Sequence, residues 1–263
     1  MRGRPQVDPG QVSSLDLDVY AALAVLIIGL SKSGFGGGIG IIAVPLMAHA
    51  LRVDRAVGVM LPILIAADAL ATWQHRGSWS KRHIRDTVIG AALGIAVGTV
   101  ILSILRDSGR LIPVLNGVVG ATCLFFVAVQ IWRMTGGKVP RVPDTTTSGI
   151  TAGALCGAVS TISHSAGPIM SIYLLEHRLE KRILVGTLVL FFFVINVAKM
   201  PTYFALGFIN SDTLLTSALY CPLVPVGAWI GLWMHHRVPE RPFVLVMYAG
   251  AAAAGAHMLA KAL

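Results

Sequence analysis

Residues Gly29–Leu46 read GLSKSGFGGGIGIIAVPL, and this stretch decides the fold. It lies within an apolar run, 17–51, that is too long for one membrane-spanning helix of about 20 residues and too short for two. Glycine and small polar residues interrupt the run between Ser31 and Gly40. Irregular backbone survives at membrane depth only where protein or water satisfies its polar groups. The stretch therefore predicts a broken or re-entrant helix.

Composition places the rest of the chain in a lipid bilayer. The 263 residues are 55% hydrophobic and 13% charged, whereas soluble proteins carry about 25% charge. Further apolar runs follow, separated by charged or turn-rich breaks, at 56–75, 84–105, 111–133, 148–176, 183–206, 213–234 and 243–260. Run 148–176 is again over-long, and it is interrupted between Ser160 and Pro168. These features predict an all-α polytopic membrane protein.

An internal repeat divides the chain into two halves. An offset of 128 residues pairs Gly29 with Gly157, His49 with His177, Leu51 with Leu179, Gly58 with Gly186 and Asp68 with Asn196. An offset of 133 then pairs Gly94 with Gly227, Gly98 with Gly231 and Gly117 with Gly250. We therefore expect two pseudo-symmetric repeats, each a broken or re-entrant helix followed by three transmembrane helices. The predicted segments are a mobile tail at 1–16, repeat 1 at 17–135, a linker at 136–147 and repeat 2 at 148–263.

The formal net charge is +9. In a membrane protein, Lys and Arg in short cytoplasmic loops set the orientation, so the positive charge does not indicate a nucleic-acid partner. Loop Asn210–Asp212 has neither residue, so it is expected outside, with Arg178–Arg182 and Arg237–Arg241 inside. Re-entrant hairpins leave three spans in each half. The second half is then inverted, and Arg76–Arg85 lies inside, as its charge requires. Fully spanning broken helices would make the repeats parallel. We favour inversion.

Both breaks offer groups that bind anions. Glycines let backbone N–H groups approach a ligand, and a helix N-terminus attracts negative charge. Close helix packing is the rival explanation for the glycines, and snorkelling to an interface is the rival one for Lys32. The candidates in the first break are Lys32, Ser33, Gly34, Phe35, Gly36, Gly37 and Gly38. Those in the second are Ser163, His164, Ser165 and Gly167, and Pro168 suits the first turn of a restarting helix.

Two further runs carry polar groups at membrane depth, where an ionisable residue indicates function. Asn196, Lys199 and Tyr203 share one helix face and are further candidates for binding the substrate. The rival role for Lys199 is a structural pairing with an acid. Asp68 is the carboxylate well inside a span, and it is either a proton carrier or a partner of Lys199. His164 is the second candidate for proton coupling.

The sequence gives no support for an enzyme, a cofactor or a metal. The Ser–His pair of the second break lacks an orienting acid and a G-x-S-x-G turn. His164, His177, His235 and His236 are not joined by carboxylates at helical spacing. No GxxxxGK[ST] motif is present, so ATP is not the direct energy source.

Three stretches resemble the TauE/SafE family of predicted sulfite and organosulfonate exporters: GLSKSGFGGGIGIIAVPL, STISHSAGPIMSIYLL and KRILVGTLVLFFFVINVAKMPTYFALGF. The resemblance covers about 17–260. It implies export of a small oxyanion, or of an anionic sulfur or carbon compound, across a prokaryotic cytoplasmic (inner) membrane, without fixing sulfite as the substrate. A secondary transporter is the leading hypothesis, and a passive anion channel is the alternative. A small anion and the lipid bilayer are the expected partners, and a homo-oligomer is compatible with the sequence.

Overall fold

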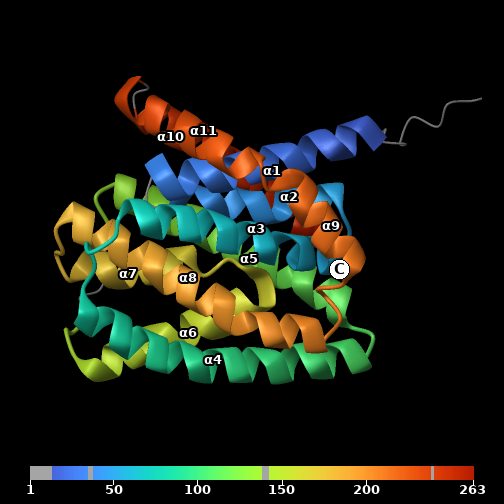
Figure 1. Ribbon diagram of the computed structural model, residues 1–263, viewed down its shortest axis with the longest axis horizontal. Coiled ribbons are helices and arrows are strands. Elements are labelled where there is room, and N and C mark those ends of the chain that lie inside the picture. Colours follow the sequence, from blue (N-terminus) through green and yellow to red (C-terminus); the bar gives the residue numbers. More distant parts are fainter. Residues whose placement is uncertain (1–13, 35–37, 138–141, 238–239) are drawn as a thin grey trace, which may run out of the picture.

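The structure is a computed structural model, and it describes residues 14–34, 38–137, 142–237 and 240–263. In these segments the regular elements are helices joined by short connections (Figure 1). The first half holds α1 (Ser14–Gly34), the 3-10 helix η1 (Gly38–Ile42), α2 (Ala43–Ala50), α3 (Val53–Gln74), α4 (Lys81–Asp107) and α5 (Leu111–Met134). The second half holds α6 (Thr146–Ser163), α7 (Gly167–Glu176), α8 (Lys181–Ala205), α9 (Ser211–Tyr220), α10 (Leu223–Arg237) and α11 (Glu240–Ala260).

Several helical segments suit a lipid bilayer. Within the described residues, five stretches are long and apolar enough to cross a membrane, namely Val53–Gln74, Lys81–Asp107, Leu111–Met134, Lys181–Ala205 and Ser211–Met234. Large apolar side chains such as Leu93, Ile104 and Trp229 are at least 60% exposed, which fits an outer surface that faces lipid. The prediction of an all-helical polytopic membrane protein is confirmed.

Both expected interruptions are present. In the first over-long run, α1 ends at Gly34 and the chain resumes at Gly38 as η1 and then α2. In the second, α6 ends at Ser163 and α7 begins at Gly167, with a proline in its first turn. The residue directly after α6 is His164, whose φ of 55° lies in the left-handed region. A left-handed residue is a common way to stop a helix.

Each interrupted pair folds back as a helical hairpin, which we call hairpin 1 (α1 to α2) and hairpin 2 (α6 to α7). Near the start of α1, the ring of Tyr20 packs edge-on against that of His49 near the end of α2, with centroids 4.7 Å apart. Gly149 near the start of α6 lies against the hydroxyl of Tyr173 near the end of α7. These two ends of each hairpin are its base, and the described residues that flank the break in each run are its tip.

Glycines seat the hairpins against neighbouring spans. Gly29 of α1 touches the backbone of α10 at Val224, and Gly157 of α6 touches the backbone of α4 at Ala91. A Cβ at either glycine would overlap these backbone atoms. Figure 1 shows the result: α1 lies with α10 along one edge, α4 and α6 lie along the other, and α3 and α8 run between them.

The two central helices, α3 and α8, run antiparallel. Gly58 near the start of α3 lies against the carbonyl of Phe208, just after α8. Gly186 near the start of α8 lies against the carbonyl of Ser78, just after α3. The loop after α3 and the loop after α8 are therefore at opposite ends of the bundle.

Some boundaries differ from those expected. The run predicted at 213–234 consists of two helices, because Pro222 separates α9 from α10 and proline has no backbone N–H to continue the hydrogen bonds of a helix. Helix α1 begins at Ser14, inside the predicted tail. The rest of that tail, 1–13, and residues 138–141 of the predicted linker lie outside the described residues.

Candidate functional site

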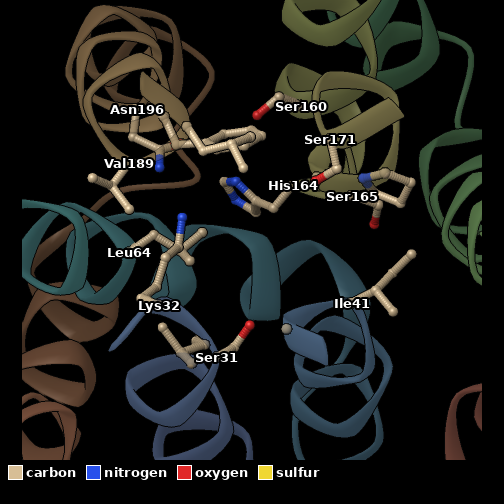
Figure 2. A pocket seen from close by; sticks show the side chains of 16 residues that line it. Ser31, Lys32, Ile41, Leu64, Ser160, His164, Ser165, Ser171, Val189 and Asn196 are labelled. Atoms are coloured by element: carbon tan, nitrogen blue, oxygen red, sulfur yellow. The ribbon is translucent and has the colours of Figure 1, made fainter. Parts of the chain in front are cut away.

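A pocket lies where the tips of both hairpins meet α3 and α8 (Figure 2). The pocket and its opening enclose about 700 Å³ of empty space. Hairpin 1 and α3 contribute Ile28, Ser31, Lys32, Gly40, Ile41 and Leu64. Hairpin 2 contributes Ser160, His164, Ser165, Gly167, Pro168 and Ser171, and α8 contributes Leu188, Val189, Phe192 and Asn196. The wall thus combines apolar side chains with hydroxyl, amide, imidazole and ammonium groups.

Hairpin 1 brings a cation that is paired with a buried carboxylate. The ammonium of Lys32 lies 2.6 Å from Oδ1 of Asp68, a fully buried side chain of α3. The other carboxylate oxygen accepts a hydrogen bond of 2.7 Å from the amide of Asn196. The ammonium also lies 4.6 Å from the centre of the Phe192 ring, which is within cation–π range. Lys32 therefore reaches from α1 across to both central helices.

Lys199 of α8 is also buried, but its partners lie in hairpin 2. Its ammonium donates to the carbonyl and the hydroxyl of Ser160, at 3.0 and 2.9 Å, and to Nδ1 of His164 at 3.1 Å. The sequence left open whether Lys199 would pair with Asp68. The structure instead pairs Asp68 with Lys32, because the hairpin 1 tip carries Lys32 alongside α3.

His164 connects α3, α8 and the tip of hairpin 2 through its two ring nitrogens. Its Nε2 lies 2.9 Å from the carbonyl of Val57 and 3.3 Å from the hydroxyl of Tyr203. That hydroxyl donates to the carbonyl of Thr161 at 2.8 Å. A carbonyl only accepts, so Nε2 carries the hydrogen, and Nδ1 is left to accept from Lys199. These partners assign a neutral imidazole to His164.

The hydroxyl of Ser31 has no partner among the residues that the structure describes. This side chain lines the pocket and is 1% exposed, and its Oγ makes no hydrogen bond to the described part of the chain. A Cβ added to Gly40 would lie only 3.0 Å from this oxygen, so the glycine leaves room beside it. An unsatisfied buried hydroxyl needs an explanation, and a polar ligand in the pocket would supply one.

The structure gathers most of the predicted site residues around this pocket. Lys32, His164, Ser165, Gly167 and Asn196 line it. Lys199 and Tyr203 stand behind the wall and bond to His164. Asp68 is joined to the wall through Lys32 and Asn196.

Other predicted residues lie apart from the pocket or outside the description. Ser33 is half-exposed on the last turn of α1, and the hydroxyl of Ser163 donates to the carbonyl of Val159. Gly34 is the last residue of α1, and Gly38 is the first of η1. Phe35, Gly36 and Gly37 lie outside the described residues.

Sequence reasoning missed several lining residues, and some of them left a signal. Phe192 stands four residues before Asn196, hence on the same face of α8. Leu64 stands four residues before Asp68 on α3, and Ser31 precedes Lys32. Phe192 and Leu64 carry neither charge nor a hydrogen-bonding group, so the polar pattern gave no signal for them, whereas Ser31 lies at the start of the predicted break.

The sequence matches the family model described as sulfite exporter TauE/SafE over residues 21–258. The chain belongs to the TauE/SafE family. This match includes both breaks and all the candidate spans named above, so the resemblance to the family is confirmed. At the level of the TauE/SafE family, the chain is a multi-pass membrane protein of the anion-exporter kind. Comparison with curated proteins gives no match, and neither does comparison with solved structures.

Proposed function

We propose that this protein is a secondary transporter that exports a small anion, such as sulfite, a sulfonate or a related compound, across a prokaryotic cytoplasmic membrane. The observation that carries the proposal is the pocket between the hairpin tips, with Lys32 in its wall and Lys199 just behind. With both lysines protonated and Asp68 ionised, these three groups leave one positive charge. A monovalent anion would neutralise it, relieving the cost of a charge at membrane depth.

Hydroxyls and a helix end would complete the recognition of the anion. Ser31, Ser165 and Ser171 border the pocket, and hydroxyls donate readily to oxyanions. The N-terminus of α7 opens on the pocket at Gly167. The positive dipole end of this helix favours a negative ligand. Broken helices whose half-helix ends face the substrate are typical of secondary transporters.

Asp68 is our candidate for coupling to protons. In the structure its carboxylate holds Lys32, so a substrate anion must compete with it. Protonation of Asp68 would release Lys32 for the anion. Binding of the proton and binding of the anion would then be linked. His164 is less suited to this role, because its free nitrogen faces the ammonium of Lys199. The gradients of anion and proton would together set the direction of net flux.

We further propose that the two halves are inverted repeats. Asp68 and Asn196 are separated by 128 residues, the offset of the repeat, and they hydrogen-bond to each other, as residues beside a pseudo-twofold axis would. The antiparallel course of α3 and α8, which the offset relates, supports the same arrangement. So does the pair Gly29 and Gly157, each of which seats one hairpin on a span of the other half.

The distribution of charge supports an orientation for these repeats. The backbone N–H of Ser80 donates to the hydroxyl of Thr187, so the basic segments Arg76–Arg85 and Arg178–Arg182 lie at one end of the bundle. Basic segments stay in the cytoplasm. Hairpin 2 would then open its base to the cytoplasm, and hairpin 1 would open its base to the outside.

A flux assay with purified protein in liposomes tests the function. Sulfite, sulfate, thiosulfate and small sulfonates would be supplied in turn, with and without an imposed pH gradient. We expect saturable flux of at least one anion and a change in its rate when the gradient is reversed. Flux that rises without saturation and ignores the gradient would favour a passive channel. No flux of any anion above that of empty liposomes would contradict the proposal.

A further inference from the structure

A second cluster of ligating side chains lies at the base of hairpin 2. It consists of His83 in the first turn of α4, Asp144 just before α6, and His177 just after α7. Nε2 of His83 is 3.8 Å from Oδ1 of Asp144, and Nε2 of His177 is 3.7 Å from the same oxygen. The three ligand atoms lie within 4.8 Å of one another. Because α7 rises about 1.5 Å per residue, this cluster is remote from the pocket.

Both imidazoles present an unsatisfied nitrogen to the carboxylate. The His83 and His177 side chains are 8% and 1% exposed, and among the described residues the buried Nε2 atom of each has no hydrogen-bond partner. Leaving a buried polar atom unpaired is unfavourable. Two such atoms aimed at one carboxylate oxygen indicate that a ligand belongs between them.

The opposite ring nitrogens are held as metal-binding histidines require. Nδ1 of His177 lies 2.6 Å from the carbonyl of Tyr173, so it carries the hydrogen and leaves a lone pair on Nε2. Nδ1 of His83 lies 2.7 Å from the hydroxyl of Ser80, which can accept in the same way. Outer partners of this kind fix the tautomer of a ligating imidazole.

A small cation would draw the three ligands closer together. Ligands at about 2.0–2.1 Å from a tetrahedral metal are roughly 3.3 Å from one another. The two contacts of Asp144, at 3.8 and 3.7 Å, must therefore shorten by about half an ångström, and the widest separation in the cluster, within 4.8 Å, by up to about 1.5 Å. Asp144 is 53% exposed and can turn inward. Its present partner is Arg82, at 3.3 Å from Oδ1. That guanidinium is 51% exposed and can swing away into water.

We propose that His83, Asp144 and His177 form a binding site for a divalent transition metal of the zinc class. Two imidazoles and one carboxylate are ligands that zinc takes, whereas magnesium and calcium prefer oxygen alone. The sequence predicts no metal, because the carboxylate that serves His177 stands 33 residues before it and not at helical spacing. Folding of hairpin 2 brings Asp144 to both histidines.

A metal here would fasten hairpin 2 to α4. His177 directly follows α7, whose first turn borders the pocket, and His83 belongs to the span beside α6. The bound ion would restrain the half-helix at the end remote from the pocket. This inference does not depend on which anion the protein carries.

Titration of the purified, chelator-stripped full chain tests the site. Zinc chloride would be added during calorimetry and before thermal unfolding, with magnesium chloride as the comparison. We expect one zinc per chain, a raised Tm, and no response to magnesium. With zinc bound, amide exchange should slow at the base of hairpin 2. Loss of an outer partner already weakens metal binding about 10- to 100-fold, so H83Q, H177Q and D144N should each weaken it at least tenfold.

The matched control is His75→Gln. His75 directly follows α3, and its Nδ1 contacts the carbonyl four residues earlier, as that of His177 does. It is not part of the cluster, so H75Q should bind zinc as the wild type does. Absence of zinc binding in the wild type overturns the proposal, and so does wild-type affinity in all three cluster variants. D144N alters an exposed side chain and keeps the test decisive if a histidine variant does not fold.

Discussion

The tip of hairpin 1 holds its lysine with a carboxylate, whereas the tip of hairpin 2 holds a lysine with neutral groups. Lys32 faces Asp68, and Lys199 faces the oxygens of Ser160 and a nitrogen of His164. A proton can cancel the charge of a carboxylate, whereas, within the described residues, Lys199 has no carboxylate partner that a proton could neutralise. We therefore propose different tasks for the two lysines, with Lys199 as a countercharge held by neutral groups and Lys32 as one whose availability depends on Asp68.

The bases of the hairpins differ as well. The repeat offset relates His49 of hairpin 1 to His177 of hairpin 2. The ring of His49 packs against the rings of Tyr20 and His257, whereas His177 faces a carboxylate and a second buried histidine. Two positions related by this offset can thus carry the same residue type in different chemical surroundings, because their neighbours come from different elements.

The largest expected effect concerns the sides on which the two hairpins open. In a background without Cys123, Cys156 and Cys221, Ser211→Cys should react fully with a membrane-impermeant maleimide added outside. Ser78→Cys should react only after permeabilisation, since its loop lies at the opposite end of the bundle. If the cysteines at positions 78 and 211 both react from the same side of the membrane, the repeats are not inverted, and the two hairpins do not open to opposite sides.

Lys32→Met tests the role of the ion pair at the hairpin 1 tip. It leaves Asp68 buried without its cation, and removing one member of a buried ion pair costs about 3–5 kcal/mol. We expect a lower Tm and no transport. The double variant with Asp68→Asn should recover the Tm, because no unpaired charge remains, yet stay inactive. Recovery of transport in the double variant would show that the pair is structural and that neither group handles the anion.

Lys199→Met tests the hairpin 2 tip. Lys199 stands behind the pocket wall and its ammonium bonds to Ser160 and His164, so it would act on the anion through its charge, and removing that charge should lower anion affinity by roughly tenfold, on the order of 1.4 kcal/mol. Adding Asp68→Asn should rescue nothing, because Lys199 bonds to Ser160 and His164 instead. Rescue by that second change would mean that Lys199 serves Asp68 after all. Lys199→Arg keeps the charge with a different shape and should keep part of the affinity. Radiolabelled-anion binding to the purified variants measures all three.

Much of the fold follows from the sequence because lipid imposes simple rules. A span needs a fixed length of apolar residues, so the runs could be counted and the two over-long ones recognised as interrupted. Gly167 and Pro168 marked the restart of the second run, and α7 begins there. The break at Pro222 was not predicted, since the run was defined by its apolar composition and a single proline hardly changes that composition.

Pairings between distant residues could not be read in the same way. The face of α8 that carries Asn196, Lys199 and Tyr203 follows from helical spacing. Which acid meets which lysine depends on how hairpin 1 lies across α3, and no local pattern encodes that. The ion pair of Lys32 with Asp68 and the approach of Asp144 to two histidines are both products of long-range packing. The structure was needed to place them.

The smallest expected effect is a null result at the base of hairpin 1. In the described part of the chain, His49 belongs to no three-ligand group, and its ring neighbours Tyr20 and His257 offer no carboxylate. His49→Gln should therefore leave zinc affinity and stoichiometry as in the wild type, while His177→Gln removes binding. Calorimetry on the two variants side by side makes the measurement. A loss of zinc binding in His49→Gln equal to that in His177→Gln would move the metal site, or add a second one, at the base of hairpin 1. The chemical difference between the two bases would then disappear, and the inferred role of Asp144 would disappear with it.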